Sequence, residues 1–153
     1  MNKYNFGEYD SKYKLSSLVN NFEAFKLDET NISKALNLCS DAWHLTDFVF
    51  TEFKDELQLE NLGDFRATLY GQCEYLKIMH DLANASKHSE LKRPKAEIKL
   101  TQKHNGAFSS AFSRDFDTSH LEIILEDDVK LDFLKIIEDV IIFWKNYFET
   151  TIR

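Results

Sequence analysis

The feature that most constrains the fold is a run of side chains between residues 32 and 57 that recurs every three or four residues. Its members are Ile32, Ala35, Leu36, Cys39, Ala42, Trp43, Thr46, Val49, Phe50, Phe53 and Leu57. This spacing draws one face of a helix about seven turns long, close to 40 Å at ~1.5 Å per residue. Asn31 stands directly before the run and is a favoured N-cap residue. We therefore predict a long amphipathic helix as the clearest element of the fold.

Two shorter helices are predicted, one before the long helix in the sequence and one after it. Ser16 or Ser17 is expected to cap the first, in which Leu18, Phe22 and Phe25 share one face. The other follows a break at residues 61–64, with Asp64 as its cap, and should end near His88. Beyond that point the charged residues before Pro94 offer no apolar period.

A last helix is predicted over residues 128–151. The acidic residues 126–128 would lie near its positive N-terminal end. Its apolar face is wide, which places it centrally in the bundle. That face consists of Leu131, Leu134, Ile137, Val140, Ile141, Trp144 and Phe148.

Between the third and the last helix the apolar period changes from three or four to two, which is typical of strands. Three strands are predicted, around Ile98, around Phe108 to Phe112, and around Ile123, with turns at residues 104–106 and 117–119. The chain is thus expected to be one α+β, mainly α domain. Its predicted parts are an N-terminal arm over 1–14, helices over 15–90, an antiparallel β-meander over 96–126 and a C-terminal helix over 128–151.

The charge balance limits the possible partners. The 26 acidic and 19 basic residues give a net charge of −7, which argues against a surface that coats duplex DNA. Residues 87–95 form the densest cationic stretch. Such a stretch is usually a solvated connection, yet a local basic pocket for RNA or a nucleotide remains compatible with the sequence.

The sequence also indicates a cytoplasmic protein without a membrane partner. No apolar stretch reaches the ~18 residues that span a bilayer, and residues 1–14 contain no apolar segment of the secretory kind. Cys39 and Cys73 lack CxxC spacing, so both are expected to be free buried thiols in a reducing compartment. No cofactor is expected.

The best candidate site is a set of polar side chains on two of the predicted helices. His80, Asn84 and His88 stand at i, i+4 and i+8, with Asp81 beside them, on the side away from Met79. Asn and Asp inside a helix lower its propensity, because their side chains compete for backbone hydrogen bonds. Their presence inside a helix therefore points to a specific structural or functional role.

The long helix carries a matching polar flank next to Trp43, in which His44 and Asp47 lie between Ser40 and Thr51. The short connection at residues 61–64 predicts antiparallel packing of the second and third helices. Residues 44–47 would then lie level with residues 77–81. We therefore expect both flanks to meet across one groove.

Several chemistries fit such a set. A histidine held by a carboxylate can act as a general acid or base, and Asn and Lys side chains can orient a phosphate. In a structural alternative, the same groups cap helices, hold the N-terminal arm or anchor the meander. Metal ligation by His44, Asp47 and either Asp81 or His88 is chemically possible, but the sequence has no HExxH or paired ExxH signature. No metal is therefore predicted.

The remaining nucleophiles and imidazoles are weaker candidates. Cys39 falls on the buried stripe, which disfavours nucleophilic catalysis. His104 is expected to be exposed in a hairpin turn. His120, at the start of a strand, is expected to be structural.

Residues 41–48 (DAWHLTDF) and 81–88 (DLANASKH) resemble the two signature stretches of a poorly characterised bacterial and phage protein family. The second stretch also resembles the HEPN superfamily of helical bundles, which includes RNases of toxin–antitoxin and defence systems. Asn84 and His88 match its Asn and His spacing, whereas Ala83 stands where the superfamily has a catalytic Arg.

The resemblance implies a HEPN-like helical bundle that acts as an RNA-directed or accessory component of a bacterial or phage conflict system, and a homodimer. An enzymatic version would be a metal-independent ribonuclease with His88 as acid or base. Asn84 and Lys87 would position phosphate, and His80 and Trp43 would contact substrate. The orienting residues would be His44, Asp47 and Asp81. The alternative is a non-catalytic dimerisation or binding module whose polar cluster is a structural hydrogen-bond network.

Overall fold

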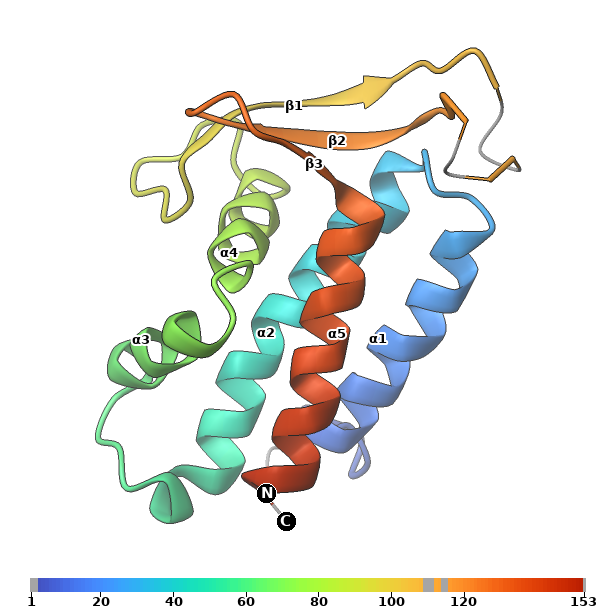
Figure 1. Cartoon of the computed structure of the whole chain (residues 1–153). Coiled ribbons are helices and arrows are strands. Elements are labelled where there is room, and N and C mark those ends of the chain that lie inside the picture. The colour runs from blue at the N-terminus through green and yellow to red at the C-terminus, as the bar shows by residue number, and fades with distance from the viewer. Residues whose placement is uncertain (1–2, 109–111, 114–115, 153) are drawn as a thin grey trace.

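The computed structural model describes residues 3–108, 112–113 and 116–152, which form five helices and a three-stranded sheet (Figure 1). The helices are α1 (Ser11–Lys26), α2 (Ile32–Leu57), α3 (Leu62–Gln72), α4 (Leu76–Ala85) and α5 (Phe133–Thr150). The strands are β1 (Ile98–His104), β2 (His120–Leu125) and β3 (Lys130–Asp132). The predicted α+β, mainly helical class with a sheet before the last helix is confirmed.

Helices α1, α2 and α5 run side by side and enclose the apolar core (Figure 1). Trp144 of α5 is fully buried, and its indole N–H donates to the carbonyl oxygen of Ala42 at 3.1 Å, which joins α5 to α2. The rings of Phe25 and Phe133 meet edge to face at 5.5 Å and join α1 to α5. The predicted central place of the last helix is confirmed, because it packs against α1, α2 and two strands.

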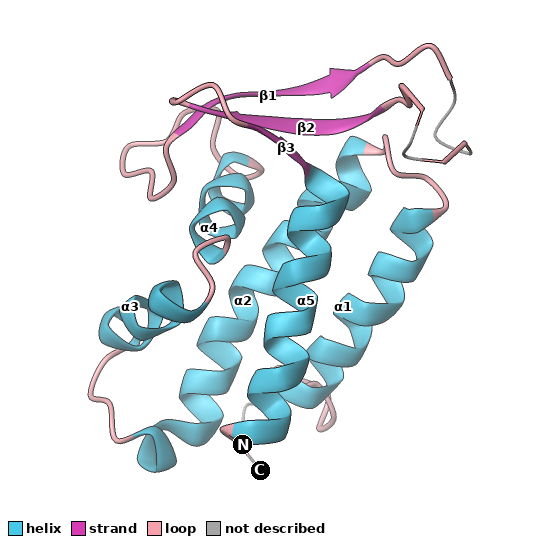
Figure 2. Cartoon of the chain, viewed as in Figure 1, coloured by secondary structure: helices cyan, strands magenta, loops and turns pink. Residues whose placement is uncertain are grey.

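The sheet lies across one end of the helical bundle (Figure 2). Strand β2 is in the middle and pairs antiparallel with both β1 and β3. Ile123 of β2 is buried on the helical side. Strand β3 leads directly into α5 because Asp132 is the N-cap, with its carboxylate accepting the Leu134 N–H at 3.1 Å.

Both predicted starts of the terminal helices were wrong. Helix α1 begins at Ser11, inside the predicted arm, because the Asp10 carboxylate accepts the Tyr13 N–H at 2.8 Å and caps the helix there. Helix α5 begins five residues later than predicted, at Phe133. Residues 126–128 are therefore not its first turn. They connect β2 to β3, where Asp128 has a positive φ of 65°.

The predicted third helix is two helices. Asn61, not Asp64, is the cap of α3, since its side chain accepts the Asp64 N–H at 2.8 Å. The helix ends at Gln72 because Cys73 has extended backbone angles, and α4 starts at Leu76. Leu69 and Leu76 are both buried and lie seven residues apart, so the apolar phase continues across the break and conceals it.

The meander has the predicted number of strands but different members. Of the predicted middle strand, Phe108 forms only an isolated bridge with Thr118, and residues 109–111 lie outside the described residues. The predicted third strand is β2, which pairs directly with β1. The sheet is completed by β3, which the last helix had been expected to include. An apolar period shows where a strand lies, but it does not identify the strand with which it pairs.

Candidate functional site

Asp81 of α4 is the centre of the polar cluster. Its side chain is 3% exposed, although the sequence had placed it on the face away from the core. Its Oδ1 and Oδ2 atoms accept the backbone N–H groups of Lys95 and Ala96, each at 2.8 Å. These residues lie just before β1, so the carboxylate fixes the entry of the chain into the sheet.

His80 continues the network from Asp81 to Asn84. Its Nδ1 lies 2.7 Å from Asp81 Oδ1, and its Nε2 lies 2.9 Å from Asn84 Nδ2. An ionised carboxylate only accepts, so Nδ1 carries the hydrogen and donates. In the neutral ring Nε2 then accepts from the Asn84 amide. Both ring nitrogens of His80 are thus occupied, and the predicted i, i+4 relation is confirmed as a direct contact.

Aromatic contacts join this network to α2 and α3. The Trp43 and His80 rings meet edge to face, with centroids 4.9 Å apart and planes at 82°. On α3, the Tyr70 ring is parallel to Trp43 at 6.2 Å. Helix α2 therefore meets the polar side of α4 at Trp43 and His80, and not through His44 and Asp47, which the sequence had placed at this contact.

Arg66 of α3 is the functional candidate that the sequence did not reveal. Its guanidinium carbon lies 4.3 Å from the Trp43 ring centroid, and its Nε donates to Thr46 Oγ1 at 2.9 Å. Burial lowers the pKa of the guanidinium, while the neighbouring Tyr70 and Asp47 oppose that effect. Arg66 and Tyr70 stand four residues apart, a spacing that could have marked a shared face.

His44 and Asp47 do not join the His80 network. His44 is half-buried, and its pKa is lowered by burial and then by the charges of Lys14 and Lys87. Asp47 is exposed and accepts a hydrogen bond from the Thr51 hydroxyl at 3.5 Å. Asp47 lines a separate hollow next to residues 5–10 of the N-terminal segment.

A depression of about 530 Å³ opens beside the network. It is lined by His80, Asn84, His88, Glu90, Leu91, Lys92 and Arg93. His88 lies beyond the end of α4, but its backbone N–H donates to the Asn84 carbonyl at 3.0 Å and its side chain is exposed. Among the described residues, no ion pair involves Lys87, Lys92 or Arg93.

The other predicted side chains have mixed outcomes. His104 is half-buried rather than freely exposed, because its Nε2 lies 2.6 Å from Asp117 Oδ1 and its ring 4.9 Å from that of His120. The Nδ1 of His120 donates to the Thr118 carbonyl at 2.8 Å. Cys39 and Cys73 are buried free thiols, as predicted, and burial raises the pKa of each.

Within residues 3–108, 112–113 and 116–152, no group of three or more His, Cys, Asp or Glu side chains is arranged to hold a metal ion. The helices in that part of the chain are also too short or too polar to cross a membrane. No protein-family model, curated protein or solved structure matches the chain. The proposed function therefore depends on the residues of this chain and on their geometry.

Proposed function

We propose that the chain binds single-stranded RNA in the depression beside α4, as an RNA-directed or accessory component of a bacterial or phage conflict system. One observation carries this proposal. The depression gathers the His88 imidazole, the Asn84 amide and the exposed cations Lys92 and Arg93, which form no ion pair with any described residue, in a chain whose net charge is −7. Among the described residues, Glu90 is the only acidic one that lines it.

The chemistry of the lining suits a phosphate backbone. Lys and Arg side chains supply the charge that attracts phosphates, and Arg can bind two phosphate oxygens at once. The Asn84 amide and the His88 imidazole can donate hydrogen bonds to phosphate or 2′-hydroxyl oxygens. A small depression with few cations on an acidic protein favours a single strand over a duplex.

In this proposal, the His80–Asp81–Asn84 network is a scaffold and not a catalytic centre. Asp81 is committed to two backbone N–H groups, and both nitrogens of His80 have partners. These polar atoms are thus engaged within the protein. The network instead holds Asn84 and the start of β1 in place beside the depression.

Fluorescence anisotropy with a labelled twelve-nucleotide single-stranded RNA, at several salt concentrations, tests this proposal. The double variant Lys92→Ala/Arg93→Ala should bind more weakly. Its logarithmic salt slope should be smaller by roughly 1.4, since each lost phosphate contact accounts for about 0.7 in single strands. The matched control Lys12→Ala/Lys145→Ala removes two exposed cations elsewhere. Equal losses in both double variants would reject a localised site.

RNA cleavage at the same place is a second candidate, and it corresponds to the HEPN-like relationship and the homodimer suggested by the sequence. It is favoured by one observation, namely that Asn84 and His88 line the same depression. Labelled RNA would be incubated with excess protein and examined on a denaturing gel. Cleavage that is lost in His88→Ala but kept in His104→Ala would support a catalytic His88. Intact RNA with the wild-type protein would contradict it.

A further inference from the structure

Strand β1 forms an exposed edge of the sheet. It pairs with β2 on one side only, and residues 99–103 are all exposed. In the described part of the chain, no backbone–backbone hydrogen bond outside the sheet involves residues 99–103. An edge of this kind can accept a further strand, and proteins commonly protect it with lysines.

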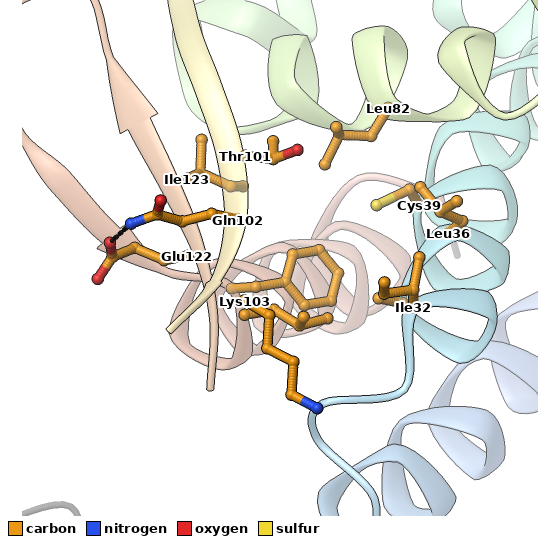
Figure 3. Close-up of a pocket in the computed structure, with 12 residues that line it drawn as sticks. Ile32, Leu36, Cys39, Leu82, Thr101, Gln102, Lys103, Glu122 and Ile123 are labelled. Carbon is orange, nitrogen blue, oxygen red and sulfur yellow. Dashed lines mark hydrogen bonds between the residues drawn. The ribbon is translucent and has the colours of Figure 1, made fainter. Parts of the chain in front are cut away.

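An apolar cavity of about 150 Å³ lies directly under this edge, between β1, β2 and the helices (Figure 3). In Figure 3, Ile32, Leu36 and Cys39 of α2 face Thr101 and Lys103 of β1 across it. Leu82 and Phe133 are also part of the lining. A dry apolar cavity of roughly 150 Å³ can hold a molecule of the size of benzene, so there is room for one aliphatic side chain.

We propose that an extended acidic peptide of a partner protein binds here by adding a strand to β1 and placing one aliphatic side chain in the cavity. Strand addition obtains affinity from main-chain hydrogen bonds and specificity from pockets that take alternate side chains. The exposed edge supplies the first requirement, and the cavity under it supplies the second.

The charge of the strand selects an acidic partner. No acidic residue occurs between Ile98 and Gly106, although the chain as a whole is acidic. Lys99 lies 2.7 Å from Asp128, whereas Lys103 forms no ion pair among the described residues and lies at the cavity (Figure 3). Antiparallel pairing of β1 with a second copy, centred on Thr101, would bring Lys99 opposite Lys103. Like charges opposite each other destabilise such a pair, so a second copy is disfavoured in this register.

The probe is a labelled seven-residue peptide with acetylated and amidated ends, in which glutamate alternates with valine around a central leucine. It should bind the wild-type protein, as measured by fluorescence anisotropy. Lys103→Glu should weaken binding by roughly tenfold or more, because like charges would then face each other. The matched charge reversal Lys145→Glu on α5 should change affinity by no more than about twofold.

Amide hydrogen exchange provides a second measurement that does not depend on a substitution. In the free protein, the amides of residues 98–104 that do not pair with β2 should exchange fast, and the peptide should protect them. Binding without this protection, or equal affinity in Lys103→Glu and the wild type, would overturn the proposal. Protection that appears without peptide and increases with protein concentration would identify a second copy as the occupant and also overturn it.

Discussion

Two of the histidine–carboxylate pairs in the described part of the chain have nearly equal lengths and very different surroundings. His80 Nδ1 lies 2.7 Å from Asp81 Oδ1 on α4, and His104 Nε2 lies 2.6 Å from Asp117 Oδ1 at the end of the sheet. The Asp81 side chain is 3% exposed, whereas that of Asp117 is 59% exposed. Equal distances therefore do not imply equal contributions to stability, since water competes only for the second pair.

The difference also extends to the other bonds of each carboxylate. The buried Asp81 carboxylate accepts two backbone N–H groups in partly buried hydrogen bonds, and its loss would leave both donors without this acceptor. Asp117 accepts one, from Ala107 at 3.2 Å, at a site that water reaches. The comparison predicts that the first pair maintains the fold and that the second mainly changes how Asp117 titrates.

The largest expected effect is that of Asp81→Asn. The new amide Nδ2 group is a hydrogen-bond donor and would face N–H groups that now donate to the carboxylate. The free energy of unfolding should therefore decrease by about 3 kcal/mol. For a chain of this length, that corresponds to a melting temperature lower by roughly 10 °C. Differential scanning calorimetry at pH 7 measures it.

The matched control is Asp117→Asn, which makes the same chemical change in the exposed pair and should lower the melting temperature far less. Similar decreases in both variants would break the comparison, because burial would then not distinguish the pairs. An unchanged melting temperature for Asp81→Asn would show that the backbone N–H groups of Lys95 and Ala96 find water instead.

An intermediate effect is expected at His44, which is half-buried without a carboxylate bonded to its ring in the described part of the chain. Burial and the charges of Lys14 and Lys87 lower its pKa below 6.5. The unfolded chain therefore binds the proton more tightly, and the folded state is stabilised above pH 6.5. That stability is lost as the pH falls from 6.5 towards the folded pKa.

Urea unfolding at pH 7.5 and pH 5.5 tests this direction. The wild type should lose more stability between the two pH values than His44→Gln does, because the glutamine does not titrate. His88→Gln is the control, since His88 is exposed. A wild type and a His44→Gln variant with the same pH dependence would mean that the surroundings of His44 are more polar than the structure shows.

The parts of the fold that the sequence predicted are those with one strong local signal. The long helix α2 was predicted from its apolar period, and Asn31 was confirmed as its cap because the side chain accepts the Lys34 N–H. The break at Cys73 could not be predicted, since the apolar phase is the same on both sides of it. The identity of β3 could not be predicted either, because three residues are too short to show a period.

The polar cluster was predicted by residue type, and its division into two parts was not. Helical spacing correctly brought His80 to Asn84, but the contact of α2 with His80 is made by Trp43 and not by His44 and Asp47 as expected. It could not show that the backbone before β1 approaches α4 and engages Asp81, because that contact joins residues 14 and 15 positions apart through tertiary packing. Arg66 was missed for a similar reason, since its place over Trp43 depends on the angle between α3 and α2.

The smallest expected effect is the titration of Asp117 itself. Its pKa lies below the usual 3.8, first because of the hydrogen bond from His104 and then because of the Ala107 N–H. A depressed carboxyl pKa stabilises the fold above the unfolded value, and this is lost as the pH falls through the folded value. The stabilisation is therefore present at neutral pH and is lost only in strongly acidic solution, and it is small because water screens the exposed pair.

Carboxyl carbon NMR resolves this titration without a stability measurement. The Asp117 midpoint should lie below 3.8 in the wild type and move back towards it in His104→Ala, with the Ala107 N–H still lowering it in part. His88→Ala should leave it in place. A midpoint that does not change in His104→Ala would mean that the exposed pair is not populated in solution. The contrast between the two regions would then be sharper still. Of these two pairs, only the buried one would persist in solution, because water would have replaced the partner of Asp117.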